Sequence, residues 1–338
     1  MDYYYSKLKN EKKKAYDAIL AGIREGRDEI IAEGINTSGE ISECFHAIQY
    51  DHPEILHVNI SRYQCIARDN SVKLYPEYIY DKKTADGIRK KVDFEVNGII
   101  SEMRRRQITG IYRMCWFIHW YLVKNCIYDH EAIDHPDEKP FAWTTEGVFL
   151  KKKAVCQGIA LAFVLLCKRC GVDAIVARGV SLEPGKTDYG PHAWNIVFSG
   201  KEAAQLDVTW DMCLTKKEGP ARHDYFFLPD IDMMRDHQYT EYPYCRRLNA
   251  TWFEMTGTFF SDMDALEKYI SELVKKNNAR KAGDVIQFHC RLYNRKESYE
   301  KVWDVVSNAV MRASGCGCKA VHSENKTQSV ICYRIELI

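Results

Sequence analysis

The order of apolar and polar residues over the first hundred positions predicts helices interrupted by one hairpin. Apolar residues recur at helical spacing among charged ones over 11–31, 39–50 and 84–106. Residues 58–80 are rich in Val, Ile and Tyr and are broken by Asp-Asn-Ser at 69–71, which favours two paired strands. This part of the chain is therefore expected to be a mainly helical module with one β-hairpin.

The pattern changes in the second hundred residues. An aromatic-rich helix is expected at 111–123, a loop at 128–140, and a strongly apolar helix from about 155 to 170 that Gly171 ends. Runs with period-two alternation then predict three strands, the last two joined by a turn at Ser199-Gly200, over 173–180, 192–198 and 203–210.

The last ninety residues alternate between helical and extended patterns, which is typical of a small α+β domain. The predicted helices lie at 262–277 and 299–311, and the predicted strands lie at 285–292, 319–322 and 328–335. The whole chain is therefore predicted to be α+β, with an N-terminal module at 1–106, a central domain at 107–248 and a C-terminal domain at 249–338.

Composition and charge exclude several classes. The 338 residues carry a formal charge of only +1, so no basic surface for nucleic acid or for an anionic membrane is expected. No apolar run approaches the roughly 20 residues of a membrane helix, and the first residues do not resemble a signal peptide. The thirteen cysteines are an odd number in a long chain, so we expect reduced thiols in a soluble, cytoplasmic protein.

One of these cysteines has an unusual position. Cys156 begins the predicted helix 155–170, and no Ser, Thr, Asp or Asn stands directly before it to cap the free backbone N–H groups. The positive end of the helix dipole and the three lysines at 151–153 should favour the thiolate and lower the thiol pKa. Cys156 is therefore a candidate nucleophile, whereas most cysteines in such a chain are packing residues.

A histidine and a carboxylate follow in the predicted strands. His192 opens the strand at 192–198, and Asp207 lies within the strand at 203–210, where a carboxylate is disfavoured and needs a reason. Because the two strands form a hairpin, the two side chains are expected to be neighbours. Cys156, His192 and Asp207 thus have the residue types of a nucleophile, a base and an orienting group, with Asp211 as the alternative carboxylate.

These motifs together resemble the transglutaminase-like superfamily, which is circularly related to papain-type cysteine proteases, and in particular its bacterial members. The matching segments are Val155-Cys156-Gln157-Gly158, Leu166 to Val172, Pro191-His192-Ala193-Trp194-Asn195 and Asp207-Val208-Thr209-Trp210-Asp211. The resemblance implies a papain-like fold in which the nucleophile helix packs on an antiparallel sheet. It also implies a Cys-His-Asp triad that hydrolyses amides of peptides or proteins, or transfers their acyl groups, through a thioester (a cysteine protease or a transglutaminase-like acyltransferase).

The resemblance leaves the second oxyanion donor open, beside the backbone N–H of Cys156. The family often uses an upstream aromatic residue, and the candidates for this role or for the cleft wall are Trp120, Tyr128, Trp143, Gln157 and Trp194.

Other chemistries are less favoured by the sequence. Cys167 and Cys170 form a Cys-x-x-Cys pair, but no second pair completes a zinc site, and Cys316-Gly317-Cys318 has the wrong spacing. Neither a calcium-binding loop nor a glycine-rich phosphate loop is present, so no metal and no cofactor are expected. The alternative is a non-catalytic transglutaminase-like domain that binds or scaffolds a partner. The oligomeric state and the choice between water and an amine as acceptor remain open.

Overall fold

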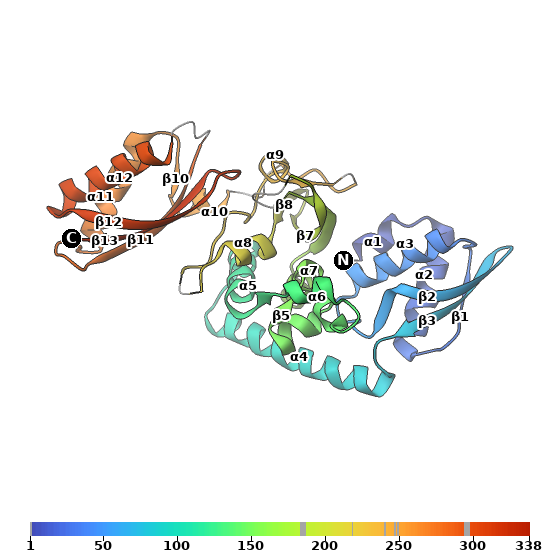
Figure 1. Ribbon diagram of the computed structural model, residues 1–338. Helices are drawn as coiled ribbons and strands as arrows, with labels where there is room; N and C mark the ends of the chain where they lie inside the picture. The colour runs from blue at the N-terminus through green and yellow to red at the C-terminus, as the bar shows by residue number, and fades with distance from the viewer. Residues whose placement is uncertain are drawn as a thin grey trace. The chain divides into compact units, whose positions relative to one another are not determined.

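The structure, a computed structural model, describes residues 2–182, 187–217, 219–239, 241–246, 248, 250–293 and 298–338. Its mixture of helices and sheets confirms the predicted α+β class (Figure 1). The chain divides into two compact units, residues 1–225 with 237–246, and residues 226–236 with 247–338. The finer division into three domains stays a prediction.

The first part of unit 1 packs helices against a small antiparallel sheet. Two helices, α2 (Asn10–Glu25) and α3 (Ser38–Asp51), follow the short α1 (Tyr3–Lys7). The sheet has the order β1-β3-β2, with the strands β1 (Ile30–Glu33), β2 (Val58–Arg68) and β3 (Ser71–Tyr78), which confirms the hairpin. The predicted helix at 11–31 is wrong at its end. Gly26 adopts a left-handed conformation with φ of 71° and ends α2, so Ile30 lies in β1.

Two long helices lead from this sheet to the central part of unit 1. They are α4 (Lys82–Arg105) and α5 (Ile111–Asn125), and they confirm the helices predicted at 84–106 and 111–123. The predicted loop at 128–140 contains a short helix, α6 (His130–Asp134), because the Asp129 side chain accepts a hydrogen bond from Ala132 N–H at 3.3 Å. The short strand β4 (Ile127–Tyr128) precedes α6, and the 3-10 turn η1 (Pro140–Trp143), the π turn η2 (Gly147–Lys151) and the strand β5 (Lys153–Ala154), which pairs with β4 in parallel, follow it.

The helix α7 (Cys156–Cys170) packs against a four-stranded antiparallel sheet of order β8-β7-β6-β9. The strands are β6 (Ala174–Ser181), β7 (Gly190–Ser199), β8 (Glu202–Leu206) and β9 (His237–Gln238). Gly171 ends α7 with φ of 74°, as the sequence predicts. The strand predicted at 203–210 is wrong in its second half, because β8 stops at Leu206 and the helix α8 (Val208–Leu214) begins.

Unit 2 contains a four-stranded sheet of order β10-β11-β13-β12. Its helices α11 (Met263–Lys276) and α12 (Tyr299–Ser314) pack against each other and, together with the sheet, enclose an apolar core (Figure 1). The strands are β10 (Phe259–Phe260), β11 (Val285–Leu292), β12 (Cys318–Asn325) and β13 (Val330–Leu337), and two short helices, α9 (Asp230–Met233) and α10 (Trp252–Met255), complete the unit. The alternation predicted for this region is confirmed. In the part of the chain that the structure describes, the helices are too short or too polar to span a bilayer.

Candidate active site

Cys156 is the first residue of α7. The N-cap residue is Val155, which has no polar side-chain atom to accept from the first backbone N–H groups, and the first turn contains no acidic residue. The free N–H groups and the positive end of the helix therefore lie beside the thiol. Cys156 is only 8% exposed, so the thiol is nearly enclosed.

The lysines before Cys156 contribute less positive charge than the sequence suggests. Each Nζ lies 3.6 to 3.8 Å from a carboxylate oxygen, in the pairs Lys151–Glu146, Lys152–Glu95 and Lys153–Asp129. Because each lysine has a carboxylate nearby, their net field at the thiol is small.

His192 and Asp207 form a buried hydrogen-bonded pair. The Nε2 atom of His192, on β7, lies 2.7 Å from Oδ2 of Asp207. The other oxygen, Oδ1, accepts from the backbone N–H groups of Thr209 and Trp210 at 2.8 and 3.1 Å, so Asp207 is the N-cap of α8. This capping explains a carboxylate at a position where strand geometry alone would disfavour one.

The charges of the three side chains depend on one another. Burial lowers the pKa of His192, but the charge of Asp207, its hydrogen bond and the contact with Cys156 outweigh this and raise the pKa to about 10. Burial raises the pKa of Cys156, but the hydrogen bond and charge of His192 and the backbone N–H of Ala193 reverse the effect and lower it. Burial likewise opposes ionisation of Asp207, and His192 more than compensates, so its pKa is lowered. The arrangement therefore favours a thiolate beside an imidazolium.

Residues 105–209 match the family model of the transglutaminase-like superfamily. The matched segment contains Cys156, His192 and Asp207. This part of the chain is a transglutaminase-like domain. Members of the superfamily often act as cysteine-dependent acyltransferases or proteases.

A solved structure described as "Crystal structure of a TGase" is also similar to this chain, with 15% identity and a TM-score of 0.30. The similarity covers 44% of this chain and 44% of that one, so less than half of that structure's length is matched. No curated protein matches the chain.

A second histidine that the sequence analysis missed lies in the site of the transglutaminase-like domain. The Nε2 atom of His237 lies 3.1 Å from Asp207 Oδ2, the same oxygen that His192 contacts. β9 brings it there, because His237 pairs with Ser181 of β6. One possible ligand atom from each of His192, Asp207 and His237 lies within 4.8 Å of the others, close enough to hold a metal ion, but Nε2 of each histidine already forms a hydrogen bond with Oδ2 of Asp207.

Among the predicted cleft residues, Gln157 lies in the first turn of α7, and Trp143, the last residue of η1, contacts it. Gln157 Nε2 donates to the backbone oxygen of Trp143 at 3.3 Å. A Cβ at Gly158 would overlap the carbonyl oxygen of Ala142 and lie 2.9 Å from that of Thr144, so only glycine allows this close approach. Among the described residues, the buried Nε1–H group of Trp143 has no hydrogen-bond partner. A buried donor without a partner is costly, which makes Trp143 the strongest candidate for an additional oxyanion donor.

The other three cleft candidates are placed differently. Trp194 is buried beneath the site, stacks on His192 with ring centroids 5.9 Å apart, and donates to Gln205 Oε1 at 2.7 Å. Trp120 lies on α5 with its ring 5.9 Å from that of Phe117. Tyr128 lies on β4 opposite Ala154 and packs edge-on against His130.

Asp211, the alternative carboxylate, has another partner. Its Oδ2 lies 2.9 Å from Nε2 of His119, and both side chains are completely buried. Its oxygens also accept from the backbone N–H groups of Asp224 and Tyr225. Asp211 is therefore part of a separate His–Asp pair.

All thirteen cysteines, including the Cys167–Cys170 pair, are free thiols. Cys167 is fully buried, and burial, followed by the neighbouring Cys115, raises its thiol pKa well above the usual value. A thiol in this state is a poor nucleophile and a poor metal ligand.

Proposed function

We propose that the transglutaminase-like domain cleaves amide bonds of peptides or proteins through a thioester on Cys156. The observation that carries the proposal is the connected set at the start of α7, in which Asp207 holds His192 and His192 contacts Cys156. This is the combination that a thiol nucleophile needs, namely a lowered thiol pKa, a proton donor and a group that orients that donor.

The steps follow from these positions. The Cys156 thiolate attacks the amide carbonyl carbon and forms a C–S bond, and the carbonyl oxygen becomes an oxyanion. When the C–N bond breaks, the His192 imidazolium gives its proton to the leaving amine, and a thioester remains. Neutral His192 then takes a proton from water or from an acceptor amine, which attacks the thioester and restores the thiolate–imidazolium pair. The acceptor decides between hydrolysis and acyl transfer.

The oxyanion would receive two hydrogen bonds. One comes from the backbone N–H of Cys156, which has no partner within its own helix. We assign the second hydrogen bond to the Nε1–H group of Trp143. Two observations support this: the group is buried without a partner among the described residues, and the backbone of Trp143 is hydrogen-bonded to Gln157, the residue after Cys156.

We further infer a reducing, cytoplasmic setting for the enzyme, supported by the thirteen free thiols.

A nitrophenyl ester tests the thiol without knowledge of the natural substrate. With p-nitrophenyl acetate we expect a burst of one nitrophenolate per chain and one acetyl group on Cys156, located by mass spectrometry. The burst should disappear in Cys156→Ala and persist in Cys213→Ala, since Cys213 is exposed and lies outside the site. Absence of the burst, together with acetylation of Cys156 no faster than of Cys213, would favour the non-catalytic alternative. Adding a primary amine during turnover separates amide formation from hydrolysis.

The role of Trp143 is tested in the same assay. Trp143→Phe keeps most of the ring volume and removes the N–H donor, so the acylation rate should fall by about 10²-fold with little change in stability. Trp120→Phe is the matched control and should leave the rate unchanged. An equal loss in both variants would contradict the assignment.

A further inference from the structure

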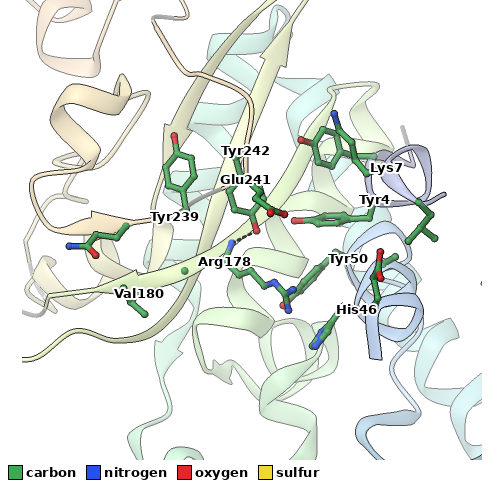
Figure 2. A pocket seen from close by; sticks show the side chains of 15 residues that line it. Tyr4, Lys7, His46, Tyr50, Arg178, Val180, Tyr239, Glu241 and Tyr242 are labelled. Atoms are coloured by element: carbon green, nitrogen blue, oxygen red, sulfur yellow. Dashed lines mark hydrogen bonds between the residues drawn. The ribbon is translucent and has the colours of Figure 1, made fainter. Parts of the chain in front are cut away.

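A cavity of about 740 Å³ lies in unit 1 between the N-terminal helices α1 and α3 and strand β6 (Figure 2). Its volume is in the range of pockets that hold small ligands or a few residues of a peptide. Tyrosine dominates the lining, with Tyr3, Tyr4, Tyr50, Tyr239 and Tyr242. Tyrosine offers a flat apolar face and a hydroxyl at low entropic cost, which suits a surface that binds peptide chain. The thioester chemistry itself makes no use of this cavity.

The cavity is adjacent to the candidate active site. Gly179, in its wall, pairs directly with His192 across β6 and β7. Tyr50, from α3, is another wall residue and is close enough to Cys156 to sense its charge. Burial is the main cause that raises the pKa of Tyr50 to about 12, and Cys156 adds to the rise. A substrate held at Cys156 could therefore extend past Tyr50 into the cavity.

Arg178 supplies a positive charge in this space. Figure 2 shows its guanidinium between Tyr50 and His46. Over the described ranges of the chain, no carboxylate lies within ion-pair distance of it. Two tyrosines of the lining hold the backbone of β6 around Arg178. The Arg178 N–H donates to the Tyr242 hydroxyl at 2.9 Å, and the Tyr4 hydroxyl donates to the carbonyl of Val176.

The remaining charged groups of the lining do not neutralise Arg178. Burial, and then Arg178 itself, lowers the pKa of His46 to about 4, so this imidazole is neutral near pH 7. Glu43 forms an ion pair with Lys12. Glu241 is exposed and lies beside Tyr242, away from the guanidinium (Figure 2), and Lys7 adds a second cation.

We propose that this cavity binds a carboxylate of the peptide substrate, with the Arg178 guanidinium as its partner. The Arg178 guanidinium, which already donates to the Tyr50 hydroxyl, has further N–H groups that can donate to a carboxylate, and the tyrosines would cover the chain that joins this carboxylate to the reacting amide. The inference rests on the proposed function, because the peptide is assumed to react at Cys156. The carboxylate can be a C-terminus or the side chain of Asp or Glu.

Three affinity labels test the proposal. The probes are iodoacetyl-Gly-Gly with a free C-terminus, its C-terminal amide, and iodoacetyl-Gly-Asp-amide, which carries only a side-chain carboxylate. In each reaction the Cys156 sulfur forms a thioether bond and iodide leaves. We expect at least one acidic label to modify Cys156 about tenfold faster than the neutral one at low salt, and the faster acid identifies the carboxylate source.

Variants of Arg178 separate binding from reactivity. Arg178→Gln should remove the advantage of the acidic label and leave the neutral label unchanged, whereas Arg178→Lys should keep part of it. Arg113→Gln removes an exposed arginine of α5 and should change neither rate. Equal rates for the acidic and neutral labels in the unmodified protein, or an equal loss of both in Arg178→Gln, would overturn the proposal.

A binding measurement does not depend on thiol reactivity. In Cys156→Ala, equilibrium dialysis compares acetyl-Gly-Gly and acetyl-Gly-Asp-amide with acetyl-Gly-Gly-amide. Tighter binding of the acids that disappears on adding Arg178→Gln supports the carboxylate site. This holds even if the neutral label shows that Cys156 is not activated, a result that would count against the proposed function alone. Absence of any acid preference overturns the carboxylate site.

Discussion

Unit 1 contains two buried His–Asp pairs whose carboxylates are four positions apart, and the two pairs have similar hydrogen bonds but different neighbouring groups. In both, Nε2 of a histidine lies close to a carboxylate oxygen, at 2.7 Å for His192–Asp207 and 2.9 Å for His119–Asp211. In each pair, backbone N–H groups also donate hydrogen bonds to the aspartate carboxylate. Short hydrogen bonds and burial therefore do not distinguish a candidate catalytic pair from a structural one.

The difference lies in the neighbouring groups. Oδ2 of Asp207 also contacts a second histidine, His237, and the pKa of Asp207 is lowered. Asp211 lies near Asp224, and burial, with the help of this second carboxylate, raises its pKa to about 6 despite His119. One carboxylate is thus kept ionised beside a histidine that contacts a thiol, and the other tends toward the neutral form in the interior.

The largest expected effect comes from replacing each carboxylate by its amide. Asp207→Asn should reduce the acylation rate by about 10³- to 10⁴-fold, because His192 loses the charge that keeps it protonated and oriented. The cap of α8 should survive, since asparagine caps a helix about as well as aspartate. Asp211→Asn should instead lower the free energy of unfolding by about 2–3 kcal/mol, because it weakens a buried pair. Burst kinetics and urea denaturation of both variants provide the measurement, and the reverse assignment of effects would break the comparison.

A second prediction concerns the pH dependence of Cys156 alkylation by iodoacetamide. Because the thiol pKa is lowered and the pKa of His192 is raised to about 10, the rate should stay nearly constant from neutral pH until His192 loses its proton near pH 10. An ordinary thiol reacts faster as the pH rises through about 8.5. The ordinary profile should appear in His192→Asn, and Asp211→Asn should retain the plateau. A rate for the unmodified protein that follows Cys213 over this range would contradict the ion pair.

The same pKa values predict where stability changes with pH. Since the pKa of folded His192 is raised, its contribution is fully present below about pH 6.5, the unfolded value, and is lost as the pH rises through about 10. The raised pKa of Asp211 gives a contribution that is lost earlier, as the pH rises from about 4 through about 6. A plot of the denaturation midpoint against pH should still show the loss of stability between about pH 4 and pH 6 in Asp207→Asn. This loss should be absent in Asp211→Asn.

The smallest expected effect concerns His237, which we regard as a positioning residue. The lowered pKa of Asp207 stabilises the fold above about pH 4, and this contribution is lost as the pH falls toward the folded value. Removing one donor in His237→Phe should raise the pKa of Asp207 and cost about 1–2 kcal/mol of stability at neutral pH, with less loss in acid. His237→Gln retains a donor and should recover part of the loss. If both variants lose the same stability at every pH, His237 contributes only packing.

The sequence predicts most elements whose pattern is local. α7 has a continuous apolar stretch and a terminating glycine, and β11 and α12 follow plain alternation and helical spacing, so their positions are confirmed. The error at 203–210 has a physical origin. Val208, Thr209 and Trp210 have strand propensity, but Asp207 supplies a helix cap, and the cap determines the local structure.

The residues that the sequence analysis missed depend on contacts between distant segments. His237 reaches Asp207 only because β9 pairs with β6. The surroundings of Arg178 include tyrosines from α1 and α3, far away in the chain. Neither placement leaves a periodic signal. The match to the transglutaminase-like family model ends at residue 209, so it also does not reach His237.

The contact at Gly158 has a consequence for how this site would change during evolution. The atoms that exclude a larger residue there are main-chain carbonyl oxygens of Ala142 and Thr144. Substitutions at positions 142 and 144 change side chains and leave those carbonyl oxygens in place. No substitution at these two positions can therefore make room for a larger residue at position 158. Among related sequences we expect an unchanged glycine facing variable neighbours, a constraint that covariation between positions cannot detect.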